Sequence, residues 1–97
     1  MHEIAENVNK AFKAFKLRGY EVLPIHNDED KPNRWGCIKK TAHGSSELIY
    51  EHDDLSKVLY FIYDNIDSMH CEDQSMLKTI VHGYAVLAET KEEYPDA

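Results

Sequence analysis

The spacing of apolar residues changes twice along this 97-residue chain, and this change limits the fold more than any other feature. Residues 1–18 repeat apolar side chains at intervals of three and four, which is the spacing of one helix face. Residues 20–51 instead hold three short runs of strand-forming residues, separated by turn-forming ones. After residue 54 the helical spacing returns in two further segments. The chain is therefore predicted to form a helix, three strands and two helices.

The first predicted helix has an apolar stripe and a polar face. The stripe consists of Ile4, Val8, Ala11, Phe12 and Phe15. The opposite face, which is predicted to be solvated, consists of His2, Glu6, Asn9, Lys13 and Lys16. Glycine is the preferred residue just beyond a helix end, and cations suit a helix C-terminus. Gly19, which follows Lys16 and Arg18, is therefore predicted to end this helix.

Three strands are predicted between the first and second helices. They span residues 20–26, 34–41 and 47–51, and turn-forming residues at 27–33 and 43–46 separate them. Pro24 lacks an N–H group, which favours a place for the first strand at a sheet edge. Short connections between consecutive strands favour an antiparallel meander.

The two C-terminal helices complete the predicted fold. The second begins after Asp53 or Asp54, either of which can accept the free N–H groups of its first turn. The third runs from about residue 72 to residue 91, and its inner stripe is predicted to consist of Leu77, Ile80, Val81, Tyr84, Leu87 and Ala88. We therefore predict a single two-layer α+β domain over residues 1–97, in the order αβββαα, with a frayed tail at 92–97.

Charge is distributed unevenly along the chain. Residues 1–40 carry eight Lys or Arg and six Asp or Glu, whereas residues 41–97 carry three Lys and twelve Asp or Glu, within a total charge of −7. A negative charge of this size disfavours binding to nucleic acid or to an anionic membrane. No segment has the pattern of a membrane span or an export signal. We therefore expect a cytoplasmic protein whose two cysteines, Cys37 and Cys71, are reduced.

The acidic C-terminal half suggests a surface for a basic protein partner. The polar face of the second helix carries Asp53, Lys57, Tyr60, Asp64 and Asp67. Tyrosine is enriched in binding surfaces, and carboxylates along a helix can take the place of phosphates in the groove of a nucleic-acid-handling protein. Further acids could extend this surface, namely Glu47, Glu51, Asp54, Glu89 and Glu93. The alternative interpretation is an ordinary solvated helix face.

The outer face of the third helix is a second candidate surface. It carries Ser75, Thr79, His82, Val86, Glu89 and Glu93. Val86, with Ala85 and Tyr84, widens the apolar surface beyond one stripe, so residues 72–91 could form a homodimer interface. The alternative interpretation is a helix that is buried on two sides.

No metal site, cofactor or catalytic motif is predicted. His70, Cys71 and His82 carry ligand atoms, but their spacing does not match the paired ligands of zinc sites. The acidic residues at 28–30 lack the ligand spacing of a calcium-binding loop. Cys37 is predicted to lie in the core rather than to act as a nucleophile. We therefore expect a non-enzymatic protein that uses no cofactor.

Basic residues in the N-terminal half support a rival hypothesis. The candidates are Arg34, Trp35, Lys39 and Lys40, which could form a sheet face for a phosphate backbone. The order of helix, three strands and helix is similar to that of double-stranded RNA-binding domains. Those domains have basic residues at the start of their last helix, where this chain has Asp53 and Asp54 with only Lys57.

In size, charge and element order the chain resembles small inhibitor proteins of phage or plasmid type and immunity-type antitoxins. It also resembles some anti-CRISPR proteins that mimic DNA. The resemblance covers the whole chain and involves no sequence motif. It implies an inhibitor that occupies a basic groove of a nuclease or another nucleic-acid-handling protein. The rival hypotheses are a nucleic-acid-binding accessory domain and a structural homo-oligomer.

Overall fold

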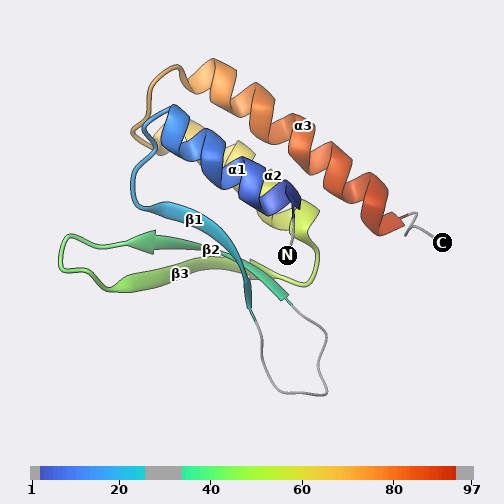
Figure 1. The fold of residues 1–97 in the computed structure, drawn as a ribbon, viewed down its shortest axis with the longest axis horizontal. Helices are drawn as coiled ribbons and strands as arrows, with labels where there is room; N and C mark the ends of the chain where they lie inside the picture. The colour runs from blue at the N-terminus through green and yellow to red at the C-terminus, as the bar shows by residue number, and fades with distance from the viewer. Residues whose placement is uncertain (1–2, 26–33, 94–97) are drawn as a thin grey trace.

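The computed structural model describes residues 3–25 and 34–93, with side chains as far as residue 91 (Figure 1). The elements are α1 (Glu3–Ala14), β1 (Tyr20–Ile25), β2 (Arg34–Lys40), β3 (Ser46–His52), α2 (Leu55–Asn65), the short 3-10 helix η1 (Ile66–Ser68) and α3 (Gln74–Glu93). The predicted α+β class and αβββαα order are confirmed. The predicted loop at 27–33 and the last four residues of the predicted tail lie outside the described residues.

The strands form one antiparallel sheet in the order β1-β2-β3. Val22 pairs with Cys37, which pairs with Tyr50, so this row of side chains points to one face of the sheet. Tyr50 stacks on Phe61 of α2, with 4.3 Å between the ring centroids. This face of the sheet therefore lies under the helices.

A side chain of α1 closes the free edge of β1. The side-chain amide of Asn9 donates from Nδ2 to the carbonyl oxygen of Val22 at 2.8 Å, and the Val22 N–H donates to Oδ1 of Asn9 at 2.8 Å. These two bonds take the place of those that a neighbouring strand would make at Val22, so this part of the edge cannot pair with another strand. The predicted solvated position of Asn9 is therefore wrong, because the edge of β1 lies beside that face of α1.

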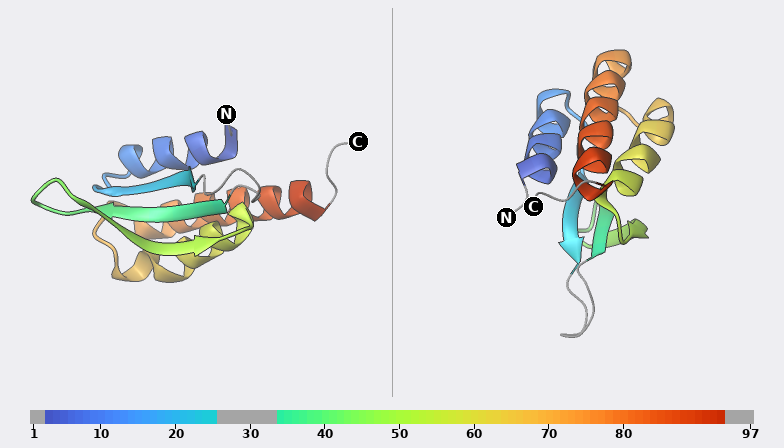
Figure 2. Two further views of the ribbon diagram at one scale, coloured as in Figure 1. Left: turned by 90° about the horizontal axis from the view of Figure 1, so that it is seen from below. Right: turned by 90° about the vertical axis from the view of Figure 1, so that its right-hand side faces the viewer.

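The helices cover one face of the sheet, and α3 lies farthest from it. α1 packs on β1, whereas α2 packs on β2 and β3. α3 packs mainly on α2 and also on α1, and it lies between them on the side away from the sheet (Figures 1 and 2). The sequence left open whether the third helix joins the helical layer or makes separate contacts, and the packing shows that it rests on both other helices.

The core fills the space between the sheet and the three helices. The predicted stripe of α1 is confirmed at Ile4, Val8 and Phe12, which are at most 3% exposed. On α3 the predicted inner stripe is wrong in one respect, because Ala85 is fully buried and Leu87 is 44% exposed. The smaller alanine side chain faces the neighbouring helices, where it allows close packing, and the larger leucine lies on the outer side.

The end of α1 differs from the prediction that Gly19 stops the helix. Lys16 already adopts a left-handed backbone conformation with φ of 58°. Its N–H donates to the carbonyl of Lys13 at 3.1 Å, and the Leu17 N–H donates to the carbonyl of Phe12 at 2.8 Å. These are the two bonds of a Schellman motif, and Leu17 and Phe12, which are both buried, occupy the two positions whose apolar contact usually accompanies it. Lys16 therefore occupies the position where glycine is preferred, and Gly19 (φ 84°) shapes the following turn.

We expect Lys16→Gly to stabilise the fold by up to about 1 kcal/mol, because glycine adopts the left-handed conformation without a Cβ clash. The lost ion pair of Lys16 with Glu72 (3.0 Å) joins two well-exposed side chains, so its contribution is small. Chemical denaturation measures the change. The matched control is Lys13→Gly, inside α1, which should instead destabilise the fold by about 1 kcal/mol. Equal destabilisation by both variants would contradict the assignment.

Two aspartates precede helices, and only one of them uses its side chain as a cap. Asp54 lies at the N-cap position of α2, but its carboxylate makes no capping bond, contrary to the prediction. Before α3, Asp73 Oδ1 accepts the N–H of Met76 at 3.3 Å, and the carbonyl of Asp73 accepts the first helical bond, from Leu77. The N–H of Asp54 instead donates to Nδ1 of His52.

Candidate protein-binding face

Aromatic rings line the surface where α2 and α3 meet. His82 of α3 lies beside two tyrosines of α2, with ring centroids 6.0 Å from Tyr60 and 5.1 Å from Tyr63. The ammonium of Lys78 lies 5.0 Å from the centroid of the Tyr63 ring, which is a cation–π contact. His82 is exposed and both tyrosines are half-buried, so the rings are fixed on one side and open to solvent on the other.

Acidic side chains border these rings. The Tyr60 hydroxyl donates to Oε1 of Glu89 at 3.2 Å, and burial, reinforced by this bond, raises the pKa of the Tyr60 phenol. At the other end, Lys78 Nζ donates to Oδ2 of Asp67 at 3.0 Å, and this bond raises the pKa of the Lys78 ammonium. Asp64 is close enough to Lys78 to contribute to the same shift. Tyr60 therefore stays a hydrogen-bond donor and Lys78 stays a cation at neutral pH.

We call this surface the α2–α3 face. It consists of Tyr60, Tyr63, Asp64, Asp67, Lys78, His82 and Glu89. Its charge is −2 with His82 neutral, since three carboxylates surround one ammonium. Part of the predicted acidic surface thus gathers here, joined by three residues that the prediction of that surface did not include, namely Tyr63, Lys78 and His82. Their sequence signal was weak, because contact across two helices leaves no spacing pattern within either.

The remaining predicted acids lie elsewhere or outside the description. Glu51 and Asp53 both pair with Arg34, the former at 2.9 Å from Oε2 to Nε. Glu47 is exposed on β3, and Asp54 is half-buried before α2. The side chain of Glu93 lies outside the described residues.

Most of the net charge also lies outside the described residues. The described side chains include ten Lys or Arg and twelve Asp or Glu, which leaves five of the seven net negative charges on the other residues. The local arrangement of rings and carboxylates therefore says more about the α2–α3 face than the total charge does.

The four residues of the rival basic face are dispersed. Arg34 is engaged by two carboxylates, and Trp35 packs against the core. Lys39 lies over the Tyr20 ring, with 5.5 Å between Nζ and the centroid. Lys40, the next residue along β2, points to the opposite side of the sheet because side chains alternate along a strand. The described residues do not bring the four together on one sheet face.

The thiols are free, and one of them is inaccessible. Cys37 is fully buried, as predicted, and this burial raises the pKa of its thiol to about 12. A protonated, buried thiol is a poor nucleophile. Cys71 is half-buried, and burial raises the pKa of its thiol as well, with a further contribution from Asp73. Across residues 3–25 and 34–91, no three His, Cys, Asp or Glu side chains gather closely enough to hold a metal ion.

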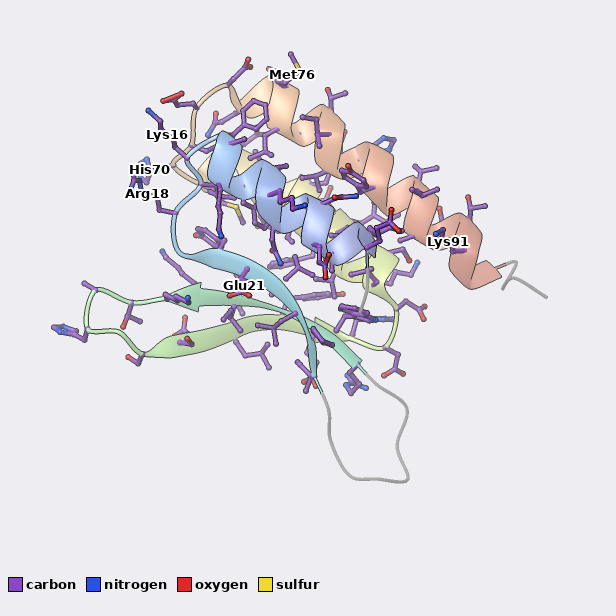
Figure 3. The ribbon with its side chains drawn as sticks, in the orientation of Figure 1. Lys16, Arg18, Glu21, His70, Met76 and Lys91 are labelled. Atoms are coloured by element: carbon purple, nitrogen blue, oxygen red, sulfur yellow. The ribbon has the colours of Figure 1, made fainter. Side chains whose placement is uncertain are left out.

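Exposed apolar side chains are concentrated on α3. Met76, Val86 and Leu87 are 41–51% exposed, and Met76 projects from the start of the helix (Figure 3). The remaining large apolar residue of similar exposure among the described side chains is Leu48 on β3. The outer side of α3 is therefore more apolar than the α2–α3 face beside it.

The fold defines a small α+β domain with a three-stranded antiparallel sheet that is covered on one face by helices. Comparison with protein-family models, with curated proteins and with solved structures finds no match to this chain. No helix among the described residues is both long and apolar enough to cross a membrane.

Proposed function

We propose that this protein is a non-enzymatic binding module that engages a basic protein through the α2–α3 face. The observation that supports this most is the contact of Tyr60 and Tyr63 with His82, bordered by Asp64, Asp67 and Glu89. Rings held by their neighbours offer a large contact area at a low cost in conformational entropy. The carboxylates around them would accept hydrogen bonds from Lys or Arg of a partner.

The chemistry of the face favours a groove that normally holds phosphates. Asp64 lies at the end of α2 and Asp67 in the adjoining η1, with Glu89 beyond the tyrosines on α3. Such spaced negative charges can compete with nucleic acid for the cations of a nuclease or another nucleic-acid-handling protein. We propose an inhibitor of this kind, of phage or plasmid type, acting in the cytoplasm, where Cys37 and Cys71 would remain reduced.

The experiment is a capture of partners by the tagged protein from nuclease-treated lysate, followed by association kinetics with the purified partner. Asp64→Lys combined with Asp67→Lys should lower the association rate at least about tenfold at low salt, because steering charges act mainly on association. The wild-type rate should fall steeply as the ionic strength rises. The matched control is Glu3→Lys with Glu6→Lys, which makes the same change in net charge on α1 and should leave the rate nearly unchanged.

Other outcomes would replace the proposal. Equal effects of both double variants would show that total charge matters rather than the α2–α3 face. Loss of all captured protein after nuclease treatment would favour direct binding of nucleic acid. A homodimer that survives the charge reversals but dissociates with Val86→Asp in sedimentation would favour self-assembly through α3.

A further inference from the structure

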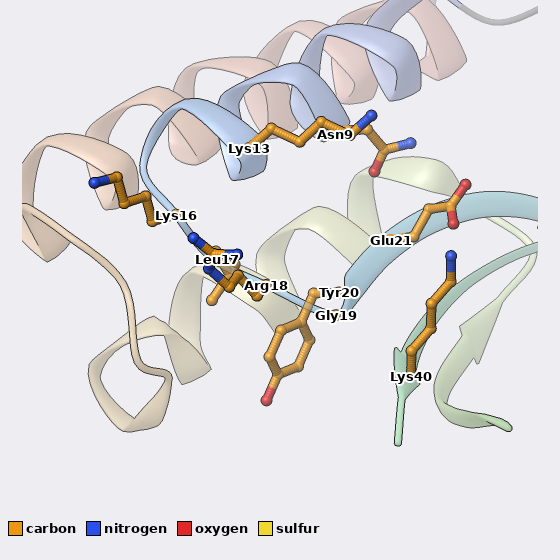
Figure 4. Close-up of a pocket in the computed structure, with 9 residues that line it drawn as sticks. All are labelled: Asn9, Lys13, Lys16, Leu17, Arg18, Gly19, Tyr20, Glu21 and Lys40. Atoms are coloured by element: carbon orange, nitrogen blue, oxygen red, sulfur yellow. The ribbon is translucent and has the colours of Figure 1, made fainter. Parts of the chain in front are cut away.

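A second site lies on another part of the molecule, between the end of α1 and the start of β1 (Figure 4). It is a concave pocket of about 610 Å³. Four cations line it, Lys13, Lys16, Arg18 and Lys40, together with a single carboxylate, Glu21. Figure 4 shows Lys13 on the α1 side of the pocket and Lys40 on the side of the sheet. Figure 4 also shows Lys16 and Arg18 extending to the other side of the pocket, away from Lys40, so the cations from three segments are spread along its wall.

The backbone fixes these segments relative to each other. The turn after α1 is closed by the Schellman bonds and contains the two left-handed residues Lys16 and Gly19. The Lys40 N–H donates to the carbonyl of Gly19 at 2.7 Å, which links β2 directly to this turn. A Cβ on Gly19 would lie 3.3 Å from the Lys40 carbonyl oxygen, so the turn and β2 approach closely there. The pocket wall is therefore held in place before any ligand binds.

Three of the four cations are not neutralised by described side chains. Lys16 pairs with Glu72 at 3.0 Å, whereas Lys13, Arg18 and Lys40 form no ion pair with any residue in the described ranges. Lys13 and Lys16 suit the C-terminus of a helix, which attracts cations. Arg18 and Lys40 lie beyond the helix, so that effect does not account for their position.

The edge of β1 adds a backbone donor to the same wall. Val22 turns its N–H and carbonyl away from β2, toward Asn9. Backbone groups two residues apart on a strand point to the same side, so the N–H of Tyr20 also faces the outer edge of β1. Tyr20 itself lines the pocket. A guanidinium, ammonium groups and a backbone N–H are the donors that bind phosphate oxygens in proteins.

We propose that this pocket binds a small organic phosphate that also carries hydroxyl groups. The cations along the wall attract the phosphate into the pocket, the Tyr20 N–H donates to it, and Glu21 accepts a hydrogen bond from a hydroxyl. The volume lies within the range of roughly 300–1,000 Å³ that is usual for small-molecule sites. A concave site of this size fits a compact ligand better than an extended phosphate backbone.

The experiment is a titration of the ¹⁵N-labelled full chain, followed by NMR, at constant ionic strength. The probes are ribose 5-phosphate, inorganic phosphate and ribose. Ribose 5-phosphate should shift the amide signals of Gly19 and Tyr20 saturably, and inorganic phosphate should shift the same signals with weaker affinity. Ribose at the same concentrations should leave them unchanged. An equal response to ribose, or a shift with chloride alone, would overturn the proposal.

Variants separate the pocket from general surface charge. Arg18→Ala and Lys40→Ala should each reduce the affinity for ribose 5-phosphate about tenfold or more, as expected for a lost charge-assisted bond. The control Lys91→Ala removes an exposed cation from α3 and should not change the affinity. Unchanged affinity in both pocket variants would overturn the assignment. So would a single-stranded oligonucleotide that binds far more tightly and shifts signals well beyond the pocket, because it would indicate a nucleic-acid surface instead.

Discussion

Phe12→Ala is expected to lower the free energy of unfolding by about 3–5 kcal/mol, the loss that is usual when a fully buried aromatic ring is removed. Phe12 is 1% exposed and is among the largest fully buried side chains of the core. Its removal leaves a cavity in the core. A domain of this size is stabilised by roughly 5–15 kcal/mol, so the variant should melt at least about 12 °C lower.

Thermal and chemical denaturation measure this loss. The matched control is Phe15→Ala, the same change three residues later, just beyond the end of α1, where the ring is half-buried and packs against the core. We expect the control to destabilise the fold by about 1–2 kcal/mol. Similar losses in the two variants would mean that the core does not centre on Phe12.

Asn9→Ala should lower the free energy of unfolding by about 2–3 kcal/mol. The substitution removes both bonds to Val22 and leaves a half-buried N–H and carbonyl without a protein partner. Part of this loss is hidden, because alanine favours a helix by roughly 0.5 kcal/mol over asparagine. The variant should also associate more readily, since the edge of β1 becomes free to pair with another strand.

Asn7→Ala is the matched control for this prediction. Asn7 lies on the same helix, and its side chain makes no hydrogen bond to a described residue, so the control should be neutral or slightly stabilising. Denaturant unfolding gives the stability, and sedimentation gives the association state. Equal stability of the two variants would show that Asn9 does not hold α1 to β1.

Local sequence patterns predicted the elements well because each pattern has a local cause. The stripe of Ile4, Val8 and Phe12 can be buried only on one side of a helix, and it is buried there. Details of the helix ends were harder to predict. Gly19 was the expected stop, but the chain already turns at Lys16, where the two Schellman bonds end the helix.

The candidate sites were predicted less completely, since each combines segments far apart in the sequence. Asp64, Asp67, Tyr60 and Glu89 were identified from the polar faces of two helices, but the way those helices pack brings His82 and Lys78 between them. Lys40 was assigned to a sheet face, whereas its position beside Gly19 places it in the pocket with Arg18.

Sequence alone predicts the order of the elements, the antiparallel connection of the strands and most of the core, because periodicity and turn residues act within a few positions of each other. Three other features appear only in the folded chain: Asn9 pairs with the edge of β1, Ala85 rather than Leu87 faces inward, and particular charged side chains meet. These features depend on the distance and orientation between elements, and packing sets both. The amino-acid sequence shows no periodic pattern that would predict them.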